Sequence, residues 1–168
     1  MNRSEYAFPH SFDSPDTLPR ETSRYGFKIN ELGFIYNSNI SSEVIKAANV
    51  CTIPATKQWF NGVINIRGNL VPVFDLNLLF FNEKTENQLF LILGKDKKSV
   101  ALRIKQFPQL IEEIEETQGD NILFKSLTIP ALIQNYISHY YINESHAWLE
   151  VDTEAFFASI TQQISLHS

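Results

Sequence analysis

The stretch from Trp59 to Leu79 constrains the fold of this chain more than any other part of its sequence. Two apolar segments, Val63–Ile66 and Leu70–Phe74, flank the tripeptide Arg-Gly-Asn at positions 67–69. Val, Ile and Phe favour a pleated, half-buried strand, and Gly-Asn favours a turn with positive φ. The pattern therefore predicts a β-hairpin or tight corner with a charged arginine at its tip.

Short apolar segments separated by turn residues recur through the rest of the chain. Tyr25–Ile29 with Leu32–Tyr36 predicts one further hairpin, and Gly33 predicts a bulge within it. Leu89–Leu93 with Val100–Ile104 predicts another hairpin, with lysines in its turn. Short strands at this regular spacing are typical of small β-barrels or sandwiches, so we expect a mainly β fold.

The two ends of the chain differ in pattern from this β-rich middle. Residues 1–24 are rich in Pro, Ser, Asp and Thr, a composition that predicts a flexible leader. Residues 25–168 are then expected to form a single domain. Near its end, Asp152 is followed by an amphipathic run through Ile160, which predicts a short helix capped by the aspartate.

Several segments are ambiguous from their residues alone. Ile40–Ile53 fits either a serine-capped helix or extended structure, and Leu110–Glu116 fits either a short amphipathic helix or an extended segment. Ile122–Leu127 and Tyr136–Ile142 are rich in apolar, β-branched or aromatic residues, and Pro130 between them excludes a continuous helix. We interpret both of these last two segments as extended.

Net charge and cysteine content limit the expected partners. The formal net charge is −5, so a phosphate backbone would be repelled unless a local basic patch formed. The densest basic group, Lys95, Lys97 and Lys98, lies in a predicted turn, and we expect no nucleic-acid partner. The single Cys51 excludes an internal disulfide, and its apolar surroundings predict a buried, unreactive thiol. With no apolar run of about 18 residues, we expect no direct membrane insertion.

The sequence shows no motif for catalysis, cofactor binding or metal binding. The four histidines, His10, His139, His146 and His167, lack metal-ligand spacing, and no nucleotide-binding or nucleophile motif occurs. Asp75 has no second carboxylate, His or Lys at a motif spacing, so we expect it to serve a turn or a helix cap. We therefore predict no enzymatic activity, no cofactor and no metal. Two alternatives stay open: a small enzyme whose site assembles only in space, and an SH3-like or OB-like binding domain with a different ligand.

The central stretch resembles the signature of the CheW-type chemotaxis coupling proteins, roughly Gly-Val-x-Asn-x-Arg-Gly-x-x-x-Pro-Val-x-Asp-Leu. The matching residues are Gly62, Val63, Asn65, Arg67, Gly68, Pro72, Val73, Asp75 and Leu76. Glu43-Val44 stands where the family has an acidic and then an aliphatic residue, without insertion or deletion, and this match implies a strand there. The family is also extended in the region equivalent to residues 110–116, so the resemblance implies an extended segment here. The chain departs from the family at Lys57, where a proline is common, and has Pro54 instead.

The resemblance spans about Tyr25 to Phe157. It implies two five-stranded, SH3-like β-barrel lobes that share a hydrophobic centre, with a short C-terminal helix. CheW-type proteins are non-enzymatic cytoplasmic adaptors, which couple the cytoplasmic tip of a methyl-accepting chemoreceptor to a CheA-type histidine kinase in membrane-bound arrays. Trp59 and the run Arg67-Gly68-Asn69-Leu70 look more like the PilI adaptors of the type IV pilus twitching-motility system. The flagellar CheW proteins are the alternative.

The resemblance also divides the signature residues into two groups. The expected partner-binding residues are Glu43, Val44, Asn65, Arg67 and Asn69. The expected structural residues are Gly62, Val63, Gly68, Pro72, Asp75 and Leu76, with Gly62 and Gly68 as backbone requirements and Pro72 as a strand-edge residue. For Arg67 two compatible interpretations stay open. It pairs with Glu43, brought alongside by strand pairing, and braces the barrel, or it belongs to a polar rim that a partner helix contacts.

Overall fold

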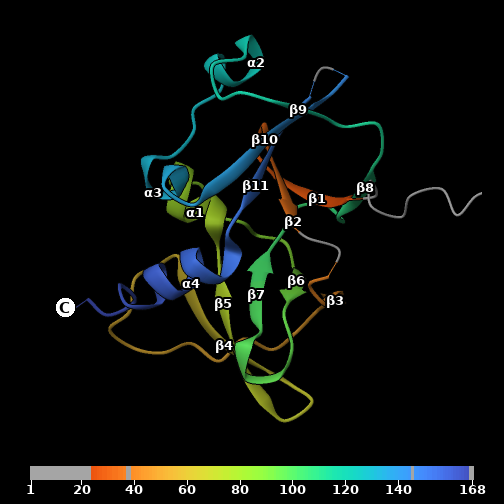
Figure 1. Ribbon diagram of the computed structural model, residues 1–168. Coiled ribbons are helices and arrows are strands. Elements are labelled where there is room, and N and C mark those ends of the chain that lie inside the picture. Colours follow the sequence, from red (N-terminus) through yellow and green to blue (C-terminus); the bar gives the residue numbers. More distant parts are fainter. Residues whose placement is uncertain (1–23, 37–38, 145, 167–168) are drawn as a thin grey trace, which may run out of the picture.

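The computed structural model describes residues 24–36, 39–144 and 146–166, which form two β-sheets with short helices beside and between them (Figure 1). The mainly β fold with a short C-terminal helix is therefore confirmed. The predicted leader at 1–24 lies outside the described residues except for Arg24. Among the described helices, none is long and apolar enough to cross a membrane.

The discontinuous lobe is the sheet whose strands come from both halves of the chain. In spatial order it contains β8 (Gln109–Ile111), β1 (Arg24–Ile29), β2 (Leu32–Tyr36), β11 (His146–Val151), β10 (Ile137–Asn143) and β9 (Glu115–Thr117). β8 and β9 lie at opposite edges of this sheet, yet only residues 112–114 separate them. Glu113 has a φ of 52°, so the chain bends there. The sheet has six short strands where five were expected, because one bent strand spans both edges.

The continuous lobe is the sheet built from a single uninterrupted segment of the chain, residues 42–103. In spatial order it contains β3 (Ser42–Lys46), β6 (Leu89–Leu93), β7 (Val100–Arg103), β5 (Asn69–Phe74) and β4 (Phe60–Ile66). The predicted hairpins β4–β5 and β6–β7 are both confirmed by their antiparallel registers. A short 3₁₀ turn, η1 (Asp96–Lys98), links β6 to β7.

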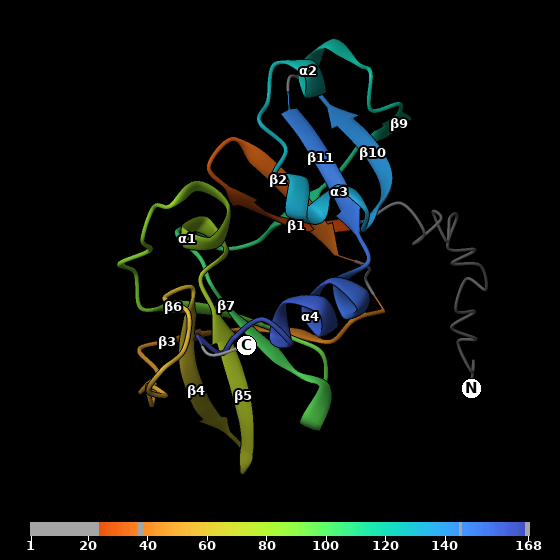
Figure 2. The ribbon, with the colours of Figure 1, turned by 90° about the vertical axis from the view of Figure 1, so that its left-hand side faces the viewer.

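A shared hydrophobic core joins the two lobes. Buried side chains from both sheets contribute to it, among them Phe27 and Phe34 from the discontinuous lobe and Phe74 from the continuous lobe. Helix α4 (Thr153–Thr161) lies between the lobes (Figure 2) and adds buried Phe157, whose ring centroid is 5.4 Å from that of Phe74. The side chain of Asp152 accepts a hydrogen bond from the Ala155 amide, which confirms the predicted cap.

Each lobe also has a smaller core of its own. In the continuous lobe it is formed by Ile64, Val71, Val73, Phe90, Ile92 and Ala101. In the discontinuous lobe it is formed by Ile35, Ile111, Tyr141 and Trp148. Because inward-facing residues alternate along each strand, every strand can supply one face to its own lobe and the other to the shared core.

The structure settles the ambiguous segments and overturns some expectations. Ile40–Ile53 contains strand β3, and Leu110–Glu116 is extended, as the resemblance implied. Ile122–Leu127 is not extended: helix α2 (Ile122–Lys125) begins there because the side chain of Asn121 accepts a hydrogen bond from the Leu123 amide. Helix α3 (Ala131–Gln134) follows. Helix α1 (Leu76–Phe81) follows Asp75, for which a turn or a helix cap was expected.

Two predictions about single residues are also wrong. Gly33 makes no bulge, since it pairs in regular register with Lys28 on β1 and with Trp148 on β11. Cys51 is exposed rather than buried, because it lies on the surface beside the β4 edge and pairs with Val63 through its backbone alone. Apolar neighbours in sequence therefore did not place this thiol in the core.

Candidate functional site

The turn between β4 and β5 carries the charged tip that the sequence predicted. Ile66 pairs with Asn69, so Arg67 and Gly68 are the two turn residues, with φ values of 50° and 85°. Positive φ at both positions is typical of a type I′ hairpin. The two residues with positive φ are therefore Arg67 and Gly68, and not Gly68 and Asn69 as the sequence predicted. The side chain of Asn65 accepts a hydrogen bond of 2.9 Å from the Gly68 amide and supports the arginine in this uncommon conformation.

Arg67 forms a bidentate ion pair with Glu43. Its Nη1 and Nη2 donate hydrogen bonds to Glu43 Oε1 and Oε2, each 2.8 Å long. The predicted pairing is confirmed, but strand pairing does not bring Glu43 alongside. β3 and β4 lie at the two edges of the sheet, and Glu43 pairs in register with Ile92 on β6. The ion pair therefore links two edges that are not hydrogen-bonded partners in this sheet.

The pair fixes the charge state of this surface. The hydrogen bonds from the Arg67 guanidinium lower the pKa of the Glu43 carboxyl, and those same bonds raise the pKa of Arg67. Both groups are therefore ionised at neutral pH. The Arg67 side chain is nevertheless 75% exposed, so its contact with Glu43 leaves the guanidinium accessible from solvent. Since a guanidinium has five N–H donors, it can serve both Glu43 and a partner.

The other predicted partner-binding residues are divided between the surface and the core. Asn69 lines a hollow of about 300 Å³ together with Glu43 and Arg67. Asn65 is exposed on the adjacent strand. Val44 does not join this group, because its half-buried side chain packs against the shared core. The structure thus brings four of the five residues together at one end of the continuous lobe.

Leu70 is a surface residue that the sequence did not single out. It pairs with Asn65 across the hairpin, and its side chain is 69% exposed. The alternation of the strand contains the signal, since a residue opposite an outward-facing asparagine must share its face. Leu70 thus adds exposed apolar area beside Arg67, a residue type that is enriched at protein interfaces.

Gly62 is a backbone requirement, as predicted. Its φ is 119°, and a Cβ built on it would lie 2.1 Å from the carbonyl oxygen of Cys51. The backbone of the next residue, Val63, exchanges hydrogen bonds of 2.8 and 2.9 Å with Cys51. The glycine therefore lets the chain from β3 lie directly against the outer edge of β4.

Pro72 is not a strand-edge residue. It lies in β5, which has β4 on one side and β7 on the other. Its partner across the β4–β5 ladder is Val63, whose backbone N–H and C=O are already bonded to Cys51. Pro72 therefore occupies a non-hydrogen-bonded pair, and pairing with β7 begins only at Val73. The missing N–H of the proline costs the sheet no hydrogen bond.

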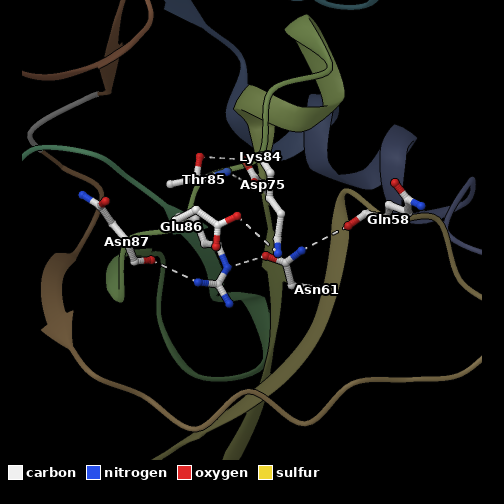
Figure 3. A network of polar contacts seen from close by, with 8 residues as sticks. Gln58, Asn61, Asp75, Lys84, Thr85, Glu86 and Asn87 are labelled. Carbon is white, nitrogen blue, oxygen red and sulfur yellow. Dashed lines mark hydrogen bonds and ion pairs between the residues drawn. The ribbon is translucent and has the colours of Figure 1, made fainter.

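Asp75 caps a helix, as predicted, and also holds a loop (Figure 3). Its buried carboxylate accepts hydrogen bonds from the Leu78 amide at 3.1 Å and from the Thr85 hydroxyl and amide at 2.9 and 2.8 Å. Leu76 is the first residue of α1 and is itself buried. Asp75, the last polar residue of the signature, thus fixes the course of the chain that follows β5.

Arg103 forms a second polar cluster that the sequence did not reveal. Its Nε donates to Asn61, its Nη1 donates to the Asn87 carbonyl at 3.0 Å, and its guanidinium lies 5.0 Å from the centroid of the Phe90 ring. Figure 3 shows Asn61 and Asn87 with their neighbours around this cluster. Together with Lys57 and Lys84, Arg103 lines an open cleft of about 920 Å³. The three cations are too far apart in the chain for any motif to connect them.

The remaining candidate groups have structural surroundings. His139 Nδ1 lies 3.4 Å from Glu150, and His146, the first residue of β11, is exposed. His10 and His167 fall outside the described residues. Within the described ranges, no three His, Cys, Asp or Glu side chains are close enough to hold a metal ion.

Comparison with known proteins gives two findings. The sequence model of the CheW-like domain matches residues 26–161. The crystal structure of the scaffolding protein TtCheW from Thermoanaerobacter tengcongensis has a similar fold, with a TM-score of 0.62 over 82% of this chain and 92% of that chain. The two sequences are 18% identical, so this likeness concerns the fold alone. No curated protein matches the chain in sequence.

Proposed function

The chain belongs to the CheW-like domain family, and from this premise we propose that it is a non-enzymatic scaffold in a chemosensory array. Its two partners are a CheA-type histidine kinase and the cytoplasmic tip of a methyl-accepting chemoreceptor. The matched segment, residues 26–161, takes in strands of both lobes and all of α4. A scaffold of this kind acts in the cytoplasm and reaches the membrane through the receptor.

The observation that carries the proposal is the polar and apolar surface at the β4–β5 turn. Arg67 is held by Glu43 and is still 75% exposed, and Leu70 beside it is 69% exposed. Arginine is enriched where interfaces gain most of their binding free energy, and the exposed leucine adds apolar area for a partner to bury beside it. We assign partner contact to Glu43, Asn65, Arg67 and Asn69. Val44 acts indirectly, by packing β3 against the shared core.

We further propose that this scaffold serves a type IV pilus system rather than a flagellar one. The sequence features behind this are Trp59 and the run Arg67-Gly68-Asn69-Leu70. Trp59 is half-buried, with its ring centroid 6.2 Å from that of Phe74, so it supports the fold. Leu70 is the residue of this set whose apolar side chain is open to a partner. Deletion in the source organism should abolish twitching and leave swimming unchanged; loss of swimming alone would assign the chain to flagellar signalling.

The partner contact is tested by capture from native lysate, with the folded protein as bait and mass spectrometry as readout. The wild-type chain should recover a CheA-type kinase and a chemoreceptor. The Arg67→Glu variant should keep its β-rich circular dichroism spectrum and recover at least about tenfold less of one partner. A folded wild-type bait that recovers neither partner would contradict the scaffold proposal and leave the fold serving another ligand.

A charge swap separates bracing from recognition. The double variant Glu43→Arg with Arg67→Glu can rebuild the ion pair with its charges exchanged. If the pair only braces the lobe, the swap restores capture that Arg67→Glu alone loses. If a partner contacts the guanidinium at the turn, the swapped protein folds and still fails to capture it, which is the result that we expect.

A further inference from the structure

An acidic surface without charged partners lies at one end of the discontinuous lobe. Glu112 and Glu113, at the bend between β8 and β9, and Glu144, in the β10–β11 turn, line a hollow of about 420 Å³. All three residues are exposed. Among the described residues none of them forms an ion pair, whereas other glutamates of the chain do: Glu43, Glu83, Glu86, Glu150 and Glu154. No ion pair among the described residues neutralises these three carboxylates; the nearby Lys28 Nζ lies over the Trp148 ring instead, 5.7 Å from its centroid.

The backbone beneath these carboxylates is held in place. The side-chain amide of Asn143, at the end of β10, donates hydrogen bonds to the carbonyl oxygens of both Glu112 and Glu113. The positive φ of Glu113 makes the chain turn sharply at this point. The bend and the β10–β11 turn are thus tied together, and the glutamates project from a fixed frame rather than from a loose loop.

Trp148 forms part of the same hollow and has an unused hydrogen-bond donor. Its side chain is 2% exposed, and its Nε1 has no acceptor among the described residues. The Cε3 and Cζ3 atoms of the indole lie against Gly33 and Gly26, so the edge that carries Nε1 faces away from β1 and β2. A buried N–H without an acceptor is uncommon in folded proteins, and it is satisfied when a ligand brings an acceptor to it.

We propose that this hollow binds a basic peptide segment of a partner protein. Lysine or arginine side chains of the segment pair with Glu112, Glu113 and Glu144, and one of its backbone carbonyl oxygens accepts a hydrogen bond from Trp148 Nε1. The site is distinct from the Arg67 surface, which lies in the other lobe. It therefore gives the scaffold a contact beyond those of its proposed function, chosen by opposite charge.

Two other cationic ligands fit the hollow less well. A divalent metal ion needs several ligands around one point, and no such cluster occurs in the described ranges. A polyamine such as spermine matches the charge but has no carbonyl oxygen for the indole N–H. A peptide supplies both kinds of group at once: cationic side chains for the three carboxylates, and backbone carbonyl oxygens for the indole N–H of Trp148.

The proposal is tested by nuclear magnetic resonance with ¹⁵N-labelled protein that carries Trp59→Phe, so that a single indole signal remains. The probe is an end-blocked peptide of alternating serine and arginine. Saturable binding with a downfield shift of the Trp148 indole proton is expected, whereas spermine of similar charge should bind without that shift. Absence of saturable peptide binding, or binding that leaves the indole signal unmoved, would overturn the proposal.

Matched charge reversals test the site itself. Glu112→Lys with Glu144→Lys should weaken peptide binding at least about tenfold. The control, Glu86→Lys with Glu154→Lys, changes the net charge equally at two exposed glutamates outside the hollow and should stay within about twofold. Equal weakening by both would mean non-specific attraction and would reject the site. If the reversed protein fails to fold, Glu144→Gln is used, with a loss of about threefold expected and an unchanged affinity counting against the site.

Discussion

In the continuous lobe the polar signature residues are paired within the chain, whereas in the discontinuous lobe a row of glutamates has no charged partner. Glu43 is bound by Arg67, and Asp75 accepts three hydrogen bonds. Glu112, Glu113 and Glu144 form no ion pair among the described residues. The lobes differ in their interiors as well. In the continuous lobe, backbone contacts at Gly62 position the β4 edge of the sheet. In the discontinuous lobe, the large indole of Trp148 fills much of the small core.

This difference explains why only one lobe carries a tight sequence signature. A residue that touches backbone, or that satisfies a buried charge, has few acceptable replacements, so its identity is visible in the sequence. A lobe filled by side-chain volume accepts many combinations of apolar residues. The following variants, from the largest expected effect to the smallest, test this contrast.

Gly62→Ala should destabilise the protein most. The new Cβ would lie 2.1 Å from the Cys51 carbonyl oxygen, at a φ of 119°, so the backbone itself must shift. We expect a loss of about 4 kcal/mol in the free energy of unfolding, measured by urea denaturation. Gly68→Ala is the control, because it has a φ of 85° but no atom within 4 Å, and it should cost about 1 kcal/mol. Equal losses would show that φ alone sets the cost.

Asp75→Ala compares a buried cap with an exposed one. Removing its carboxylate leaves the two buried Thr85 donors and the part-buried Leu78 amide without their acceptor, and about 3 kcal/mol of unfolding free energy should be lost. Asp152→Ala removes a single exposed cap bond at α4 and should cost about 1 kcal/mol. Thermal unfolding of the two variants side by side gives the comparison. A smaller loss at position 75 than at 152 would contradict the bracing role of the signature aspartate.

Gly33→Ala probes the discontinuous lobe. Its Cβ would lie 2.4 Å from Trp148 Cε3 and 2.7 Å from the Ala147 carbonyl oxygen, so the indole and the backbone must both shift, and we expect a loss of about 2 kcal/mol. In a Trp148→Phe background the cost should fall by roughly 1 kcal/mol, because the smaller ring leaves space. A double-mutant cycle in urea measures this coupling. Additive losses would show that the indole is not what limits the space at position 33.

The smallest effect concerns the exposed ion pair. Since Arg67 lowers the pKa of Glu43 from its ordinary value, the pair stabilises the fold above that ordinary value, and this stabilisation is lost as the pH falls through the lowered pKa. Titration of the Glu43 carboxyl by ¹³C resonance should show the lowered pKa in the wild type and a return toward the ordinary value in Arg67→Ala. An identical midpoint in both proteins would mean that the pair does not form in solution.

The sequence predicted those elements in which local pattern and tertiary contacts agree. The hairpins and the Asp152 cap belong to this group, whereas the Arg67–Glu43 pair was expected from the family resemblance and through a strand pairing that does not occur. The predictions that failed concern residues whose local sequence favours a different structure from the one observed. Asn121 starts a helical turn in a β-branched run, and Cys51 lies at the surface within apolar residues. The Arg103 cluster and the acidic hollow depend on residues brought together only by the sheets, so no spacing in the chain contains them.

The order of strands in the discontinuous lobe has a consequence for synthesis on the ribosome. Every pairing in the continuous lobe is available once β7 has emerged, because residues 42–103 suffice. The β1–β2 hairpin, made first, must wait for β11, since Gly33 pairs with Trp148. At about 5–20 residues per second, the roughly 110 residues between β2 and β11 take about 5–20 seconds to translate. During that interval an aromatic hairpin has an unpaired strand edge, so the nascent chain is more open to pairing with other chains at that point than at its finished surface.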